Sequence, residues 1–212
     1  MAGFADGDTL KITEKLVQQV VQTLLSSQQT LSFAESCSGG LLSVQITELS
    51  GVSAVFMGSV VSYSNEAKVE ILGVGLGSLQ LQGAVSQIVA QEMAQGVRHR
   101  FHTDWGVSIT GIAGPTGGSA EKPVGTVWIA VCGPLLASGI GGRTQTIGRA
   151  DCQQRGSDRA DSKKGRAADN PESSNLSESF VEARKYFFKG NRREIQEQAV
   201  QSALELLLEA LS

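Results

Sequence analysis

The sequence contains few cysteines and histidines, and those it has are scattered. Its three cysteines, Cys37, Cys132 and Cys152, are far apart and form no CxxC pair. An odd number of widely spaced cysteines argues against both a disulfide framework and a zinc site. The two histidines, His99 and His102, fall near the end of an expected helix, where surface roles are commoner than catalytic ones.

A strong charge imbalance and long apolar runs are also missing. The formal net charge is -3 over 212 residues, so the sequence predicts no general binding of nucleic acid or other polyanions, although a local cationic pocket is compatible with it. No apolar run approaches the length of a membrane span, and the N-terminal segment MAGFADGDTLK lacks the apolar core of a secretory signal. Together with the cysteine usage, these features predict a cytoplasmic protein without a membrane partner.

The sequence does contain an alternation of helical and strand patterns, with residues 74–84 expected to be irregular. Helices are expected at 8–27, 38–49, 64–73, 86–102 and about 191–211, and strands at 30–34, 56–62, 105–110, 126–132 and 184–188. This alternation predicts a three-layer α/β/α sandwich. No convincing helix separates the last two strands, so we expect them to form a hairpin in a mixed, mostly parallel sheet of about five strands.

The composition changes abruptly between Ala137 and Glu182. This segment is crowded with Gly, Ser, Asp, Arg and Lys and contains one aromatic residue, Phe180. Such a segment buries too little apolar area to offset the entropy lost on ordering. The sequence therefore predicts a single domain over residues 8–212, interrupted by a flexible insertion at 137–182.

The stretch TLSFAESCSGG, from Thr30 to Gly40, has the pattern of a strand that enters a polar turn and then a helix. It brings Ser36, Cys37 and Ser38 to a helix N-terminus, where backbone N–H groups are unpaired and negative charge is favoured. Hydroxyl and thiol groups beside a carboxylate are candidate nucleophiles. The same local pattern also fits a tight turn whose small residues merely cap the helix.

Two further polar segments follow strands: Tyr63 to Lys68 follows the second expected strand, and Thr110 to Gly118 follows the third. The carboxyl ends of strands form the ligand crevice in open α/β sheets. A Ser with a nearby Lys is a nucleophile–base pairing used where no His is available. The Gly-rich loop 111–125 lets backbone amides approach a ligand closely, but it matches neither a Walker loop nor a GxGxxG turn.

Several long strings resemble, in order, the CinA C-terminal domain family, which includes the nicotinamide-nucleotide amidases called PncC. They are AESCSGG, SVVSYSNEAKVEILGV, GAVS, VSITGIAGPTGGSAEKPVGTVWIA and FFKGNRREIQEQAV. The resemblance covers about residues 10–135 and 183–211. The chain departs from the family pattern at 137–182, where the family usually has a short connection, and at Ser38, where it typically has Thr.

The resemblance implies hydrolysis of the carboxamide of nicotinamide mononucleotide to nicotinate mononucleotide and ammonia, a step of pyridine nucleotide salvage that needs no metal or organic cofactor. On that basis Ser36 is the expected nucleophile and Lys68 the expected base, with Tyr63 orienting or relaying the proton. Ser38 is the alternative nucleophile. Cys37 is a weaker one, because no activating His accompanies it.

Further residues are expected to bind the substrate. Amides of residues 37–40 would form the oxyanion hole, Ser108, Thr110 and the 111–114 turn would line the nicotinamide and ribose site, and Arg192 would bind the phosphate with charge-assisted geometry. The alternative for Arg192 is a solvated first-turn charge. The full expected set of substrate-binding residues is Glu35, Gly39, Gly40, Ser108, Thr110, Gly111, Ala113, Gly114 and Arg192.

Two other functions fit the same sequence. The domain could be a non-catalytic nucleotide-binding or interaction module, as the association of CinA proteins with competence and DNA damage suggests. A different small-amide hydrolase would keep the Ser–Lys pair without needing Arg192. The expected partner is a small-molecule nucleotide substrate and not nucleic acid, and a homo-oligomer is expected because related domains commonly associate.

Overall fold

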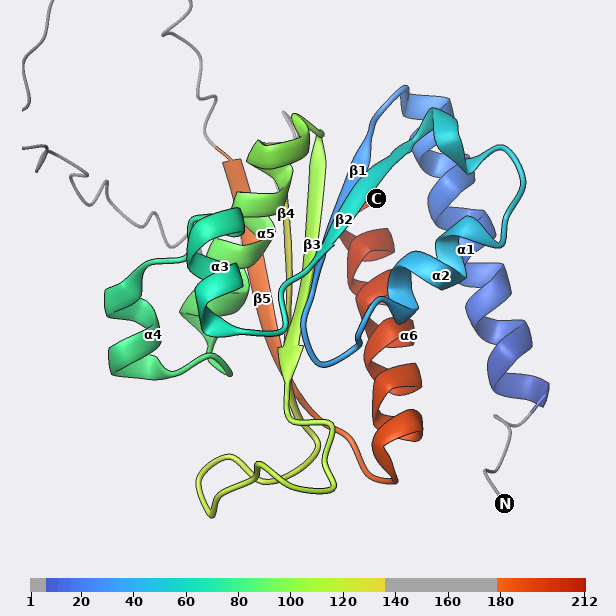
Figure 1. The fold of residues 1–212 in the computed structure, drawn as a ribbon. Helices are drawn as coiled ribbons and strands as arrows, with labels where there is room; N and C mark the ends of the chain where they lie inside the picture. The colour runs from blue at the N-terminus through green and yellow to red at the C-terminus, as the bar shows by residue number, and fades with distance from the viewer. Residues whose placement is uncertain (1–6, 136–178) are drawn as a thin grey trace, which may run out of the picture.

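The structure, a computed structural model, describes residues 7–135 and 179–212, with side chains from Ile12 onward. Its strands are β1 (Leu31–Glu35), β2 (Phe56–Val61), β3 (Trp105–Gly111), β4 (Thr126–Pro134) and β5 (Ser179–Phe187). Its helices are α1 (Gly7–Ser27), α2 (Leu41–Thr47), α3 (Asn65–Leu72), α4 (Leu76–Gln82), α5 (Gln87–Phe101) and α6 (Arg192–Leu211), with a 3-10 turn at Val52–Ala54 (Figure 1).

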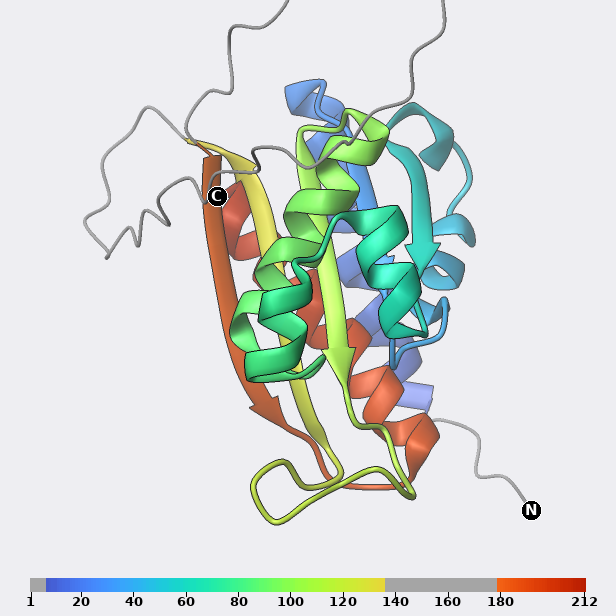
Figure 2. The ribbon, with the colours of Figure 1, turned by 60° about the vertical axis from the view of Figure 1, so that its left-hand side comes forward.

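The strands form one mixed sheet in the order β2-β1-β3-β4-β5. Both β2 and β3 run parallel to β1, whereas β4 is antiparallel to β3 and to β5. Figure 2 shows β4 and β5 side by side as a long hairpin at one edge of the sheet. The predicted mixed sheet and the predicted hairpin are therefore confirmed.

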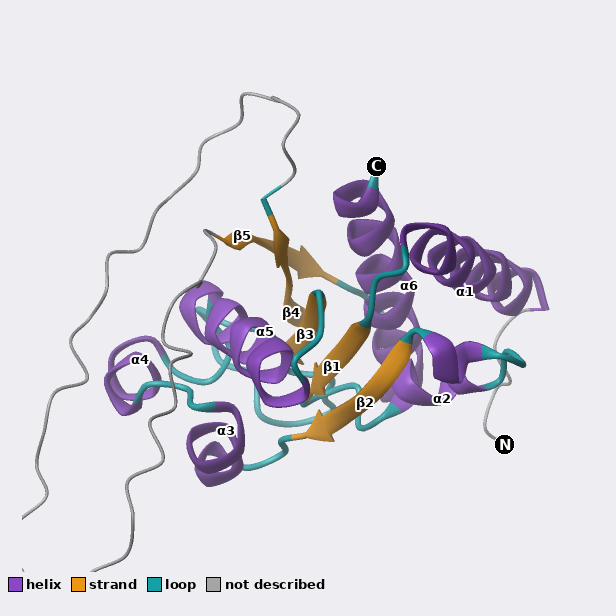
Figure 3. Ribbon diagram, turned by 90° about the horizontal axis from the view of Figure 1, so that it is seen from above, coloured by secondary structure: helices purple, strands orange, loops and turns teal. Residues whose placement is uncertain are grey.

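The sheet lies between two layers of helices, as the predicted α/β/α sandwich requires. Seen from above, α1, α2 and α6 cover one face and α3, α4 and α5 cover the other (Figure 3). β1 and β3 are buried along almost their whole length because both faces are covered. The larger core joins the sheet to α1, α2 and α6, and a smaller one lies under α3 and α5. None of the helices in the described part combines the length and apolar content of a bilayer span.

A close helix contact brings α3 against α5. A Cβ atom built at Gly96 of α5 would lie 1.9 Å from the carbonyl oxygen of Leu72 in α3. Only glycine leaves room for this backbone approach. The contact matters for the site because α3 carries Lys68.

Three sequence-based boundaries need correction. Residues 74–84 are not irregular, because α4 occupies Leu76–Gln82. This helix has no side-chain cap of its own at Gly75; instead Glu92 of α5 accepts hydrogen bonds from Gly75 N and Ser78 Oγ. Helix α2 begins at Leu41 and not at residue 38, because the preceding glycines adopt left-handed conformations.

The last strand also begins earlier than predicted. β5 starts at Ser179, which pairs with Pro134, and the partly buried residues 179–182 extend the β4–β5 ladder. These four residues therefore belong to the sheet and not to the predicted insertion. The rest of that insertion, up to residue 178, lies outside the described residues.

We predict that Gly96→Ala lowers the free energy of unfolding by about 1–3 kcal/mol, because the added methyl group overpacks the α3–α5 contact. Gly77→Ala in α4 is the matched control, since a Cβ atom added there would have nothing within 4 Å. There the better helix propensity of Ala should leave stability unchanged or raise it by up to about 1 kcal/mol. Urea denaturation of both variants tests the contact; equal stabilities would contradict it.

Candidate active site

The register of the sheet places three hydroxyl residues at one level. The last residues of β1 and β2 pair with each other, and the last residue of β1 also pairs with Ile109 of β3. The next residues, Ser36, Ser62 and Thr110, therefore lie side by side at the carboxyl ends of the parallel strands. The backbone N–H of Ser36 donates to the carbonyl oxygen of Ile109 at 3.0 Å, which fixes the start of the turn.

Lys68 reaches this level from α3. Ser64 is the N-cap of this helix, and its hydroxyl accepts from the N–H of Ala67. Lys68 follows one turn later and its side chain is buried, with 1% of its surface exposed. Its Nζ lies 3.0 Å from Ser36 Oγ and donates to the carbonyl oxygen of Ser62 at 2.6 Å. The structure thus brings together the predicted Ser–Lys pair and adds a third group that orients the amine.

The burial of Lys68 changes its protonation. Removal from water lowers the pKa of the Lys68 amine, and the nearby Cys37 thiol opposes this shift. A neutral amine has a lone pair that can accept the proton of Ser36. The geometry and the direction of the pKa shift therefore both suit Lys68 to act as a base.

A pocket of about 250 Å³ opens above the Ser–Lys pair. It is slightly smaller than the range of about 300–1,000 Å³ typical of small-molecule sites. Its wall consists of Ser36, Cys37, Tyr63, Asn65, Lys68, Ala84, Val85, Thr110, Gly111, Ile112, Ala113, Gly114, Thr116, Gly117 and Arg192. A neighbouring hollow shares Ala113 and Arg192 with it and continues to Pro115, Val124 and the start of α6.

Five of the predicted site residues do not belong to the wall of this pocket: Glu35, Ser38, Gly39, Gly40 and Ser108. The hydroxyl of Ser108 donates to the carbonyl oxygen of Ala90 at 2.6 Å, so it ties β3 to α5. Thr110 does line the pocket, although its hydroxyl donates to Ala84 O at 2.9 Å.

The turn after Ser36 is tightly constrained. Gly39 and Gly40 have φ values of 66° and 97°, which favour glycine. Their amides already donate, that of Gly39 to Ser36 O and that of Gly40 to Glu35 Oε2. Of the amides predicted for an oxyanion hole, those of Cys37 and Ser38 donate to no backbone oxygen in the described part of the chain and instead interact with the sulfur of Cys37.

A side chain of α6 also holds the turn after Ser36 in place. Gln196 Nε2 donates to the carbonyl oxygen of Cys37 at 2.8 Å. In a trans peptide the following N–H points away from that carbonyl. The bond therefore also sets the direction of the Ser38 amide.

The two alternative nucleophiles are less suited to the reaction than Ser36. Burial raises the pKa of Cys37 to about 12, so this thiol stays neutral and weakly nucleophilic near neutral pH. Ser38 is 3% exposed, and its hydroxyl has no hydrogen-bond partner among the described residues. Ser36 is the one hydroxyl of the three-residue run Ser36–Ser38 that both lines the pocket and contacts Lys68.

Tyr63 lies at the rim of the pocket. Its side chain is 67% exposed, and within the described residues it makes no hydrogen bond to Ser36 or Lys68. This position allows contact with a bound molecule and does not show a proton relay.

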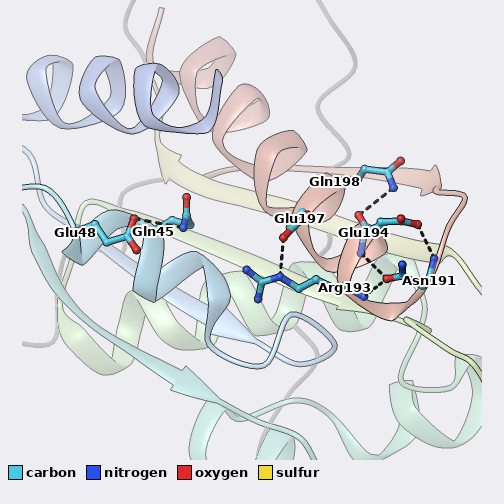
Figure 4. Close-up of polar contacts among 7 residues, drawn as sticks. All are labelled: Gln45, Glu48, Asn191, Arg193, Glu194, Glu197 and Gln198. Atoms are coloured by element: carbon cyan, nitrogen blue, oxygen red, sulfur yellow. Dashed lines mark hydrogen bonds and ion pairs between the residues drawn. The ribbon is translucent and has the colours of Figure 1, made fainter. Parts of the chain in front are cut away.

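Two arginines at the start of α6 differ in whether their side chains are already paired. Asn191 caps the helix by accepting from the amides of Arg193 and Glu194, and Arg193 Nε binds Glu197 at 2.6 Å (Figure 4). Arg192, by contrast, makes no hydrogen bond or ion pair with any described residue, and it lines both the pocket and the neighbouring hollow. Its guanidinium is therefore available to an anion.

Several wall residues were not predicted. Asn65 follows Tyr63 in the chain, and its position after a strand could have indicated it. The carbonyl of Ser62, which orients Lys68 without belonging to the wall, was also not predicted. Ala84 and Val85 precede α5 and meet the pocket only through the packing of that helix on the sheet. In the described ranges, no three His, Cys, Asp or Glu side chains gather closely enough to hold a metal ion.

Comparison with known sequences identifies the family. The profile of the CinA C-terminal domain matches residues 13–158. A CinA-like protein of Fervidobacterium nodosum is 52% identical over 134 residues, which is 63% of this chain and 32% of that protein. A CinA-like protein of Microcystis aeruginosa is 53% identical over 130 residues, which is 61% of this chain and 30% of that protein. The chain thus spans about a third of the length of the curated relatives it matches.

Solved structures agree over the full fold. The competence/damage inducible protein CihA of Agrobacterium tumefaciens has a TM-score of 0.69 at 31% identity, covering 100% of this chain and 99% of that one. A competence-damaged protein (CinA) superfamily protein of Escherichia coli has a TM-score of 0.68 at 27% identity, covering 99% and 94%. With its profile match over more than half of its length, this chain belongs to the CinA C-terminal domain family.

Proposed function

We propose that this chain hydrolyses the carboxamide of nicotinamide mononucleotide to nicotinate mononucleotide and ammonia. The observation that carries the proposal is the 3.0 Å contact between buried Lys68 Nζ and Ser36 Oγ at a pocket wall. Amide hydrolysis needs a nucleophile, a base that later protonates the leaving group, and donors for an oxyanion. The unpaired Arg192 at the same pocket supports a substrate that carries a phosphate.

In the first half of the reaction, Ser36 Oγ attacks the carboxamide carbon while its proton passes to neutral Lys68. The amides of Cys37 and Ser38 stabilise the oxyanion of the tetrahedral intermediate. Lys68 then gives the proton to the amide nitrogen, the C–N bond breaks and ammonia leaves. A Ser36 ester of the nicotinoyl group remains.

In the second half, water attacks this ester and Lys68 takes the proton of the water. Collapse of the second tetrahedral intermediate returns the proton to Ser36 Oγ and releases the carboxylic acid, which ionises to nicotinate mononucleotide. One water is consumed and one ammonia is formed in each turnover. The Ser62 carbonyl holds Lys68 in place throughout, as the third member of the catalytic unit.

The rest of the pocket supports binding of the nucleotide. Thr110 and the turn through Gly111, Ala113 and Gly114 form the wall proposed for the nicotinamide and ribose. Tyr63 at the rim would orient the substrate. The cationic pyridinium ring adds to the effect of burial, because a nearby positive charge further favours neutral Lys68.

The direct test is ammonia release from the mononucleotide by purified protein, with mass detection of the product. Binding of the product without turnover would instead favour the nucleotide-binding or interaction module, with which the competence/damage names of the solved structures are compatible. Turnover of other small amides at equal rates would point to a general amidase.

Ser36→Ala should reduce turnover at least about a thousandfold, because a nucleophile–base unit fails when one member is lost. Ser38→Ala is the matched control. It should keep near-parental turnover, and it should not lower the melting temperature, because it removes a buried hydroxyl that lacks a partner among the described residues. Steady-state ammonia release and thermal melts measure both effects. Near-parental turnover in Ser36→Ala together with a loss in Ser38→Ala would identify Ser38 as the nucleophile.

The pH profile tests Lys68 as the base. Protonated Lys68 cannot accept the Ser36 proton, so kcat/KM should rise with pH and level off above the pKa of Lys68. Because burial lowers this pKa, the midpoint should lie below the ordinary lysine value of about 10.4. Lys68→Arg should be almost inactive, because arginine keeps its proton. Substantial activity of Lys68→Arg together with loss in Lys68→Met would mean that the lysine acts only through its charge.

Arg192 is tested by comparing two substrates. Arg192→Ala should raise KM for nicotinamide mononucleotide by about tenfold or more, as expected for loss of a charge-assisted hydrogen bond. It should change KM for nicotinamide riboside, which lacks the phosphate, much less. Arg193→Ala serves as the control, because Arg193 is already paired with Glu197. An equal effect of Arg192→Ala on both substrates would refute phosphate binding.

A further inference from the structure

We propose that Glu35 is a positioning residue that holds the nucleophile turn and the base in register, and not a substrate-binding residue. The inference rests on the proposed function, since it assigns a task within the same site. Glu35 is completely buried and lies outside the wall of the pocket. A bound substrate in that pocket would therefore not reach its carboxylate.

The Glu35 carboxylate accepts four hydrogen bonds from the start of α2. Oε2 accepts from the amides of Gly40 at 3.0 Å and Leu42 at 3.1 Å. Oε1 accepts from the amide and the hydroxyl of Ser43, at 2.9 and 2.5 Å. Residue 40, at the N-cap, is a glycine without a capping side chain. The side chain of Glu35 thus caps α2 although Glu35 lies before the turn that leads into this helix. These bonds hold the turn of residues 36–39 in place between Glu35 and the start of α2.

The same residue also fixes the base. The carbonyl oxygen of Glu35 accepts from the N–H of Ser62 at 2.8 Å and from the Ser62 hydroxyl at 3.5 Å. The carbonyl of Ser62 in turn accepts from Lys68 Nζ. Glu35 is therefore joined to Ser36 by a peptide bond and to Lys68 by hydrogen bonds through Ser62. A small shift of Glu35 would alter the distance on which proton transfer depends.

Glutamine cannot replace this carboxylate. Both oxygens of Glu35 face N–H donors, and each backbone donor is fixed in direction. Whichever way the amide introduced by Glu35→Gln is turned, its NH₂ group meets at least one N–H, and a donor cannot accept. The Ser43 hydroxyl can rotate, but the three backbone amides cannot. Glu35→Gln therefore keeps the shape of the side chain while breaking the cap.

The fold offers a matched control in Glu92. Its carboxylate also binds the start of a helix, accepting from Gly75 N and Ser78 Oγ at α4. Neither Glu92 nor these two partners lines the pocket. Glu92→Gln makes the same Glu-to-Gln change away from the Ser–Lys pair, but there the amide oxygen can still accept from Gly75 N while its NH₂ group donates to the Ser78 hydroxyl.

The experiment compares Glu35→Gln, Ser43→Ala and Glu92→Gln as full chains, assayed at a temperature where melting curves show each to be folded. Glu35→Gln should lower kcat by about 10–100-fold with KM within about twofold of the parent, because misplacement of reacting groups by about 1 Å has effects of this size. Ser43→Ala, which removes one of the four bonds, should cause a smaller loss. Glu92→Gln, which removes a carboxylate charge but can keep both contacts of the cap, should leave kcat unchanged.

A second readout does not depend on the natural substrate. A fluorophosphonate probe labels activated serines, and mass spectrometry of peptides reports the rate at Ser36. Glu35→Gln should slow this labelling by a factor similar to its effect on kcat, and Glu92→Gln should not. If the parent is labelled but releases no ammonia, the proposed function fails while the labelling rates still test Glu35.

Three results would overturn the positioning role. These are parental kcat and labelling rate in folded Glu35→Gln, a rise in KM without loss of kcat, and equal losses in Glu35→Gln and Glu92→Gln. The second result would return Glu35 to substrate binding, and the third would mean that a nonspecific effect of removing a carboxylate charge explains the loss. A parent whose Ser36 is neither labelled nor catalytic would leave no nucleophile to position and would also refute the inference.

Discussion

The buried amine of Lys68 is the constraint on which the site depends. Its Nζ contacts Ser36 Oγ and the Ser62 carbonyl, and burial favours the neutral form that can accept a proton. A buried amine is costly to desolvate, so its surroundings must hold it in one place. Much of the local structure serves that requirement: the parallel register of β1, β2 and β3 aligns the hydroxyl residues, and the glycine contact at Gly96 lets α3 lie close enough to deliver the lysine.

The fold was largely predictable because the alternation of patterns along the chain reflects burial in a covered sheet. The order of helices and strands and the β4–β5 hairpin were confirmed, since each depends on local periodicity and on the absence of a crossover helix. The existence of α4 was missed because its N-terminus is capped by Glu92, a residue far along the chain. The early start of β5 was missed because pairing with β4, and not local propensity, extends that strand.

The sequence was enough to select the residues at the centre of the candidate site, but not to tell which neighbouring side chains point into the pocket. Strand ends and a family resemblance were enough to select Ser36 and Lys68, and the structure places them 3.0 Å apart. The same reasoning grouped Glu35 and Ser108 with them, yet both side chains turn to the backbone of neighbouring helices. Glu35 directly precedes Ser36 and so faces the opposite side of the sheet, whereas Ser108 lies on the same side as Thr110 but is bound to the backbone of α5.

The charges around the pocket explain why Glu35 must turn away. In the described part of the chain, the pocket wall contains no carboxylate. A carboxylate there would attract the pyridinium of the proposed substrate, but it would also stabilise protonated Lys68 and remove the base. Glu35 avoids this conflict because the amides of α2 occupy both of its oxygens. In the proposed function the negative charge of the substrate is left to Arg192 on the pocket wall, so substrate binding and deprotonation of Lys68 would not compete.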